Sequence, residues 1–197
     1  MKKCANIIKA SKMYVSDIVS SLPPEFYYHN LQHTQYVVEG VKIMSDYHVV
    51  SPEKREKLIL AAWFHDTGFI ESYKNHESHS QHIATQFLHN LNCSESDILQ
   101  VCHLIEATRL PTNPKSLSEK IICDADMRHL AANNYMEINN KLRQEVMSCC
   151  HEKFDDETWA FLNLRFLEIH RYYTSYAKEI LRPKKEVNIA QIEYTYS

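Results

Sequence analysis

The sequence predicts an all-α protein, and two observations support that prediction. The chain of 197 residues contains only two glycines, whereas average usage would give about fourteen. A sheet protein of this size would need glycine in its turns and bulges. Apolar residues instead recur every three or four positions, as they do on one face of a helix. We therefore expect a single helical domain over residues 1–197, a bundle of about eight helices.

The composition restricts the classes of protein and partner. A net charge of -3 with mixed signs gives no basic field that would attract a nucleic acid polymer. The longest apolar run is too short to cross a bilayer, and the apolar stretch near the N-terminus is broken too early for a signal peptide. The six cysteines show no C-x-x-C spacing, so we expect reduced thiols. A cytoplasmic protein with neither a membrane nor a nucleic acid as partner is expected.

Two amphipathic helices are expected at the start of the chain. Apolar residues at helical spacing predict a helix over residues 4–22, which Pro23 ends because proline cannot continue a helix. An aromatic turn that includes His29 follows. The second helix is expected over residues 32–47, with His33 in its first turn.

The third expected helix is the most apolar and ends on two polar residues. Ser51 and Pro52 indicate its start, since a hydroxyl suits the N-cap and proline suits the first helical position. Seven consecutive apolar residues, 58–64, form its body, and His65 and Asp66 follow at once. An imidazole and a carboxylate at the end of a rigid, buried helix make half of a divalent-metal site.

Two further helices are expected in the middle of the chain. A polar loop over residues 69–75 precedes a helix whose first turn carries His76 and Glu77. The next helix begins at Ser94, in a sequence that resembles a capping box, and extends to about residue 107.

A helix after the proline-containing loop 109–116 carries two carboxylates in an apolar setting. Asp124 and Asp126 both lie among apolar residues of this helix. Because a buried carboxylate is costly unless it is paired or bound to a metal, either aspartate is a candidate ligand. With two histidines and one aspartate from elsewhere, such a set would suit a divalent transition metal.

Two long helices are expected near the C-terminus, over residues 136–150 and 156–182. Pro183 is expected to end the second helix, and the tail to residue 197 is expected to be a short helix or an arm. We interpret the apolar stripe of the second helix as core. The stripe consists of Trp159, Leu162, Phe166, Ile169 and Tyr173.

The order of these polar residues resembles the HD-domain superfamily of metal-dependent phosphohydrolases, an all-helical fold named for its His-Asp dipeptide. The resemblance covers about residues 28–130, and the helices over 136–197 would pack on that core. Its strongest pieces are residues 29–34, 61–68, 75–77 with Ser80, and 120–126. It implies that one divalent metal ion, whether Mn, Fe, Ni, Co, Zn or Mg, is bound by His33, His65, Asp66 and Asp126. The alanine before Asp126 matches the family pattern, and Asp124 is the alternative ligand.

The resemblance also implies a reaction. The expected activity is hydrolysis of a phosphoester or phosphoanhydride in a small phosphorylated metabolite, with a nucleotide as the leading substrate class. Candidates for proton transfer are His29, His76 and Glu77. Candidates for binding phosphate are the cations near the ligands in sequence, namely Lys74, Arg109, Lys115 and Arg128.

Each site residue also has a structural interpretation. His33 could cap or pack a helix, and Asp66 could be a solvated residue at a helix end. Asp126 could form a buried salt bridge with Arg128 or Arg143. The occurrence of all these residues in the family order favours the metal site.

Two other functions stay open. An HD-type di-iron oxygenase would need further histidine ligands for a second metal ion, and the helix over residues 98–108 offers His103 more than a turn away from the expected position. One metal ion is therefore expected rather than two. A non-catalytic nucleotide-binding protein could also keep this fold, although all four ligand positions are filled here.

Overall fold

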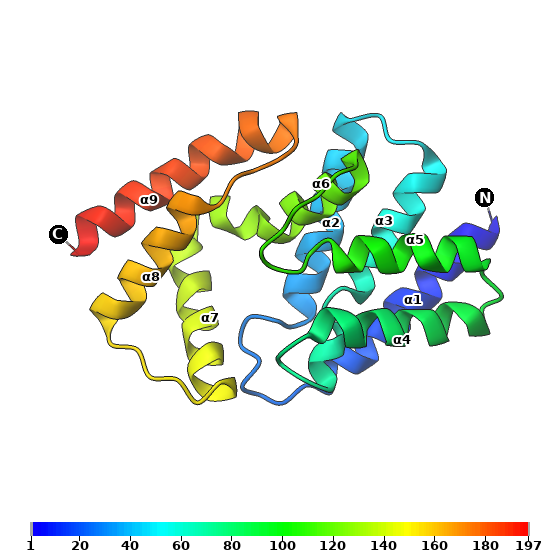
Figure 1. The fold of residues 1–197 in the computed structure, drawn as a ribbon, viewed down its shortest axis with the longest axis horizontal. Coiled ribbons are helices and arrows are strands. Elements are labelled where there is room, and N and C mark those ends of the chain that lie inside the picture. Colours follow the sequence, from blue (N-terminus) through cyan, green and yellow to red (C-terminus); the bar gives the residue numbers. More distant parts are fainter. Residues whose placement is uncertain (1, 197) are drawn as a thin grey trace. The chain divides into compact units, whose positions relative to one another are not determined.

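The computed structural model describes residues 2–196, with side-chain environments for residues 6–195, and the regular secondary structure of this part of the chain is all helical. It contains nine α-helices and three short segments of other helical types (Figure 1). In chain order they are α1 (Lys2–Ser20), α2 (Leu31–Tyr47), α3 (Pro52–Phe64), η1 (Thr67–Ile70), α4 (His76–Asn90), α5 (Glu95–Glu106), α6 (Leu117–Asp126), η2 (Met127–Ala131), α7 (Tyr135–Cys149), α8 (Asp156–Ile169), η3 (Ala177–Leu181) and α9 (Arg182–Tyr196). The predicted all-α fold is confirmed.

The chain divides into two compact units, and the first is built around α3. This unit contains the residues up to Pro23 together with His29–Asp126. Helix α3 packs against α1, α2 and α5, and its side chains are buried from Lys57 to its end. A helix that is buried on all sides must be apolar on all sides, which explains the predicted apolar body. Helices α4 and α5 lie side by side (Figure 1), and α6 packs against α2.

Two helix starts in this unit are capped by side chains, and the cap at Ser94 was predicted. The Asn30 side chain accepts hydrogen bonds from the backbone N–H groups of Gln32 at 2.9 Å and His33 at 3.3 Å. His33 therefore lies in the first turn of α2, as predicted. At α5, the Ser94 hydroxyl accepts from the Asp97 N–H at 3.2 Å and donates to the Asp97 carboxylate at 2.7 Å.

The second unit has its own small core. It contains Pro24–Tyr28 and the chain from Met127 onward. Helix α9 packs against α8 and η2, and η2 also packs against α7. The buried core residues are Leu130, Tyr135, Leu167 and Ile192. The predicted packing of residues 136–197 on the HD core stays a prediction.

The predicted continuous helix over residues 156–182 is wrong, because α8 ends at Ile169. A new helix begins after Thr174, whose hydroxyl accepts the backbone N–H of Ala177 at 3.1 Å. This is ordinary N-cap chemistry, and the sequence pattern did not indicate it because apolar residues continue across the break. The end of α8 is also held from α9, where Lys185 Nζ donates to the Leu167 carbonyl at 2.7 Å.

Pro183 does not end a helix, contrary to expectation. It is the second residue of α9, which directly follows the π-helical segment η3. The N–H of Arg182, the first residue of α9, donates to the Ala177 carbonyl. A proline inside an α-helix lacks an N–H and its ring conflicts with the carbonyl four residues earlier. The π-helical turn changes the hydrogen-bond register just before the proline, so the helix continues past it.

The prediction that the apolar stripe is core is wrong. Of its members, Leu162, Phe166 and Ile169 are exposed, and Trp159 and Tyr173 are half-buried. The buried apolar residues of α8 are instead Ala160 and Leu167, which lie outside the stripe. The stripe was expected to be core because its spacing is helical, but spacing alone does not show which face another helix covers.

Two expectations from composition can be followed in the described residues. The five cysteines with described side chains are all free thiols, while Cys4 lies outside the described side chains. Within the described chain, each helix is too short or too polar to cross a membrane. The cytoplasmic location stays a prediction.

Candidate metal centre

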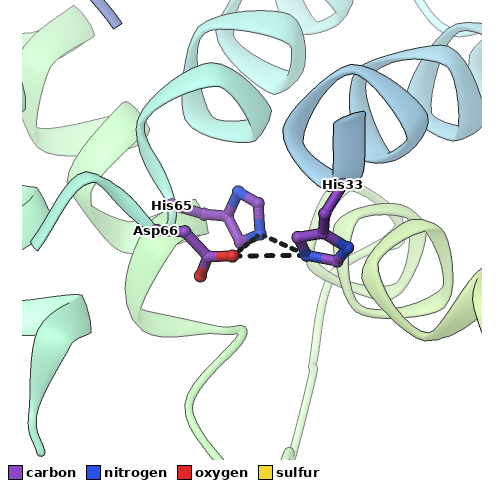
Figure 2. Close-up of side chains that lie close together, drawn as sticks. All are labelled: His33, His65 and Asp66. Carbon is purple, nitrogen blue, oxygen red and sulfur yellow. Dashed lines mark hydrogen bonds and ion pairs between the residues drawn. The ribbon is translucent and has the colours of Figure 1, made fainter. Parts of the chain in front are cut away.

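Three side chains of the predicted site converge inside the first unit (Figure 2). His33 comes from the first turn of α2, and His65 and Asp66 follow the last residue of α3. One ligand atom from each residue lies within 4.8 Å of the other two. The two Nε2 atoms are 3.4 Å apart, and Asp66 Oδ2 lies 3.2 Å from that of His33 and 3.0 Å from that of His65. All three residues are buried.

The backbone at the end of α3 lets two adjacent residues face one point. Neighbours on a helix normally diverge by about 100°. His65 keeps helical dihedral angles, with φ -52° and ψ -36°, whereas Asp66 leaves the helix with φ -107° and ψ 4°. The change in backbone direction between the two residues brings both side chains to the same side.

The carbonyl of Ala62 sets the orientation of the His65 ring. His65 Nδ1 lies 2.9 Å from this oxygen. Because a carbonyl oxygen only accepts hydrogen bonds, Nδ1 carries the proton in this contact. In the neutral ring, Nε2 is then an unprotonated lone-pair donor that faces His33 and Asp66, which is the tautomer a metal ligand needs.

The fourth predicted ligand also faces this point. Asp126 is the last residue of α6, and its Oδ1 lies 3.3 Å from Nε2 of His33 and 3.6 Å from Nε2 of His65. Asp124, the alternative ligand, is fully buried in the same helix. The contacts to both imidazoles favour Asp126.

These residues fit a divalent metal ion. An ion with bonds of about 2.1 Å would hold neighbouring ligand atoms about 3.0 to 3.4 Å apart, close to the separations given above. Asp66 Oδ2 is buried and has no hydrogen-bond partner of good geometry, although two imidazoles approach it. Two imidazoles and two carboxylates can bind one dication and neutralise its charge.

The electrostatics of the cluster favour a positive charge at its centre. Burial alone would lower the pKa of His33 and His65, but the close carboxylates of Asp66 and Asp126 outweigh burial and raise both pKa values. Burial would raise the pKa of Asp66, yet the charge of His65 and the close imidazoles of His33 and His76 hold it well below its usual value. A bound dication would take the place of the protons on the imidazoles.

The turn after Asp66 is fixed by contacts with α4. The Ser80 hydroxyl donates to the His65 carbonyl at 2.6 Å and accepts the Gly68 N–H at 2.8 Å. A Cβ atom at Gly68 would lie 2.0 Å from the His76 carbonyl oxygen. Glycine is therefore required here for the close approach of α4, whose first turn lies beside the cluster.

The two candidate proton-transfer histidines lie beside the cluster and share a contact with Phe69. His76 Nε2 is 3.5 Å from Asp66 Oδ1, and its ring stacks on Phe69 with 3.9 Å between ring centroids. The His29 ring lies 4.5 Å from that of Phe69 and 5.5 Å from that of His33. Phe69 was placed only in a loop by the sequence. Its position directly after Thr67-Gly68 is the one sequence signal of its proximity to the site.

The predicted phosphate-binding cations differ in their surroundings. Lys74 is exposed, and Lys115 is exposed with its Nζ 2.7 Å from the Asn113 side-chain oxygen. Arg109 forms an ion pair of 2.9 Å with the buried Glu77. Arg128 is half-buried in η2 of the second unit. Their roles in substrate binding stay predictions.

The all-helical fold and the His-His-Asp cluster define a class of helical protein with a candidate metal centre. A comparison with protein families gives a match to the HD domain over residues 30–131, slightly more than half of the chain. The chain therefore belongs to the HD domain family, whose general activity is metal-dependent phosphohydrolysis. No curated protein and no solved structure gave a match.

Proposed function

We propose that this protein is a metal-dependent phosphohydrolase that cleaves a phosphoester or phosphoanhydride in a small phosphorylated metabolite, with a nucleotide as substrate. The observation that supports it best is the convergence of four ligand atoms, from His33, His65, Asp66 and Asp126, within the matched family segment. The coarser conclusion, a hydrolase of the HD domain family, follows from the family itself.

In this proposal, side chains of the protein bind the metal ion and transfer protons. The four ligands bind one divalent metal ion, which supplies polarisation of a phosphoryl oxygen and a lower pKa for a bound water. His29 and His76 flank the cluster and are placed to accept or donate protons, as is Glu77 beside His76. The burial of the ligands excludes competing water and strengthens their electrostatic effect on a phosphoryl group.

The cations supply the second part of the proposal. Lys74 and Lys115 lie in loops and are exposed, and Lys115 can exchange its contact with Asn113 for a phosphate. We assign these two to the substrate, because flexible ammonium groups bind phosphate oxygens well. The predicted role of Arg128, which belongs to the second unit, stays a prediction. Arg109 has a different setting, because Glu77 and Glu106 already pair with its guanidinium.

The proposal is tested by elemental analysis of the purified protein followed by a substrate screen. We expect about one divalent metal ion per chain, and turnover of nucleotides in preference to sugar phosphates when Mn²⁺, Co²⁺, Ni²⁺ or Mg²⁺ is supplied. Asp66→Ala should lose the metal and reduce turnover by more than about 100-fold, because metal sites are this sensitive even to changes around the ligands.

Asp46→Ala is the matched control for that experiment. Asp46 lies in the same unit but is exposed and paired with Arg55, so its loss should leave metal content and turnover unchanged. Full metal content and turnover in a folded Asp66→Ala protein, measured beside this control, would show that the assignment of the site is wrong.

A di-iron oxygenase is the second candidate, and one observation favours it. Asp66 Oδ1 faces His76 Nε2 at 3.5 Å, on the side of the carboxylate away from the two other histidines. A second metal ion there would need another ligand from α5, whose His103 is exposed. Two irons per chain and oxygen-dependent turnover would support this candidate. Nucleotide binding without turnover in any divalent metal would instead support a non-catalytic binding protein.

A further inference from the structure

Arg109 is one of the cations expected to bind phosphate, yet protein groups already engage its guanidinium fully. A guanidinium group has five N–H donors. Nε donates to Glu106 Oε1 at 2.6 Å, Nη1 contacts Glu77 Oε2 at 2.9 Å and Asn75 Oδ1 at 3.4 Å, and Nη2 donates to Ser78 Oγ at 2.8 Å and Glu106 Oε2 at 3.1 Å. Each donor has an acceptor, so no N–H remains for a phosphate oxygen.

The acceptors of Arg109 lie on two helices that meet beside the site. Asn75 is the N-cap residue of α4, Ser78 lies in the first turn of α4, and Glu106 is the last residue of α5. A planar guanidinium held from several directions is a rigid support, because its fork fixes both the position and the plane of a carboxylate. Arg109 therefore connects the end of α5 to the start of α4.

Glu77 is the acceptor that leads from Arg109 toward the cluster. Its side chain is buried, and one oxygen is used by Arg109. The other oxygen lies 3.8 Å from His76 Nε2, which is itself 3.5 Å from Asp66 Oδ1. A buried carboxylate needs a paired cation to stay charged at low cost, and Arg109 is that cation.

We propose that Arg109 is a positioning residue, which fixes the Glu77 carboxylate beside His76 at the edge of the metal cluster and does not bind substrate phosphate. This inference rests on the proposed phosphohydrolase function, in which Glu77 handles a proton of the reaction. Arg109 acts on the reaction only through Glu77.

A double-mutant cycle in steady-state kinetics tests the inference, with Arg109→Gln, Glu77→Gln and the double variant compared on the substrate found in the screen. We expect each single variant to lower kcat by about 100-fold, the usual size of a lost proton-transfer group, with KM changed less than threefold. The double variant should be no slower than Glu77→Gln alone, because removing Arg109 has no further effect once the carboxylate is gone.

Arg109→Lys and Arg55→Gln complete the experiment. Lysine keeps the charge but loses the planar fork, so Arg109→Lys should recover only part of kcat and leave KM unchanged. Arg55 pairs with Asp46 on the surface of the same unit, and Arg55→Gln should match the wild type. Circular dichroism and metal content show that each variant is folded and loaded. If Arg109→Gln does not fold, the cycle is run with Arg109→Lys.

The outcomes separate this inference from the function on which it rests. A tenfold or larger rise in KM for Arg109→Gln, or losses in kcat that multiply in the double variant, would mean that Arg109 contacts the substrate and would overturn the inference alone. Wild-type protein that holds metal but turns over no phosphorylated substrate would overturn the proposed function, and the inference with it.

Discussion

Both units of this protein bury polar side chains, and two sets of these side chains have different partners. In the first unit, His33, His65 and Asp66 face one another, and the buried Asp66 Oδ2 has no hydrogen-bond partner of good geometry. In the second unit, Lys185 and Asn188 are just as buried, yet each donates to two backbone carbonyls. Buried polarity alone therefore does not indicate a functional site.

The partner of a buried polar group separates the two cases. A side chain that binds backbone carbonyls completes the hydrogen bonding of helix ends, which is a structural task. Side chains that direct lone pairs at one another are unfavourable unless a cation lies among them. The comparison predicts that substitutions of Lys185 or Asn188 change stability alone, whereas substitutions in the cluster change metal binding first.

The largest effect on stability is expected for Lys185→Met. Burial lowers the pKa of Lys185, and its Nζ donates to the carbonyls of Leu167 and His170. Methionine has a side chain of similar length, but it leaves both carbonyls without this donor. We expect this loss to lower the free energy of unfolding by about 3 kcal/mol. Urea unfolding measures this cost. Lys184→Met, at an exposed neighbouring position, should cost far less, and equal stability of the two variants would contradict the structural role.

A slightly smaller effect is expected when metal is added to the wild-type protein. A ligand that binds only the folded state stabilises it by about 2.7 kcal/mol at 100 times its dissociation constant. Thermal unfolding of chelator-treated protein with and without Mn²⁺ measures this increment. Lys185→Met should keep the increment and Asp66→Ala should lose it. The same increment in both variants would remove the distinction between the two kinds of buried polar group.

The smallest effect is expected for Asp97, which forms a 2.9 Å ion pair with Lys57 and is about half exposed. A hydrogen bond from Ser94, then one from Lys57, lowers the pKa of Asp97 below its model-compound value of 3.8. A carboxyl whose pKa is lowered by folding adds stability above its unfolded pKa, and this stability is lost as pH falls through the folded pKa.

The measurement for Asp97 is urea unfolding of the wild type and Asp97→Asn between pH 3 and pH 6. The wild type should be more stable at pH 6 by less than about 1 kcal/mol, since exposed ion pairs contribute little. The difference should shrink as the pH approaches 3. If the difference in stability grew toward low pH, folding would raise the pKa of Asp97 and not lower it, contrary to this prediction.

Much of the fold could be predicted because its signals are local. The cap at Ser94, the start of α3 at Pro52 and the place of His33 in the first turn of α2 depend on a few neighbouring residues, and the structure has them as predicted. Even so, the Ser51 hydroxyl makes no capping hydrogen bond. The failures lie where distant residues decide the outcome, as at Ile169, where α8 ends and a lysine from α9 binds its last carbonyls.

The candidate site, like the fold, could be predicted only in part from the sequence. The family order identified His33, His65 and Asp66, and the structure brings them together. Their roles as ligands stay predictions. The contacts of Arg109 could not be predicted, because its partners Asn75 and Ser78 lie more than thirty residues earlier in the chain. The sequence around a loop arginine does not show whether its guanidinium binds substrate phosphate or pairs with other groups of the protein.

The hydrogen bond from His65 to the Ala62 carbonyl has a consequence for how this site could be altered. The group that selects the imidazole tautomer is part of the main chain, so a different side chain at position 62 would leave the selection intact as long as the helix persists. A local loss of helical geometry in the last turn of α3 would instead remove the acceptor. The tautomer of the His65 ring therefore depends on the helical backbone and not on a side chain. If every substitution at position 62 were tested for activity, the activity should depend on the size and helix propensity of the new residue rather than on its polarity.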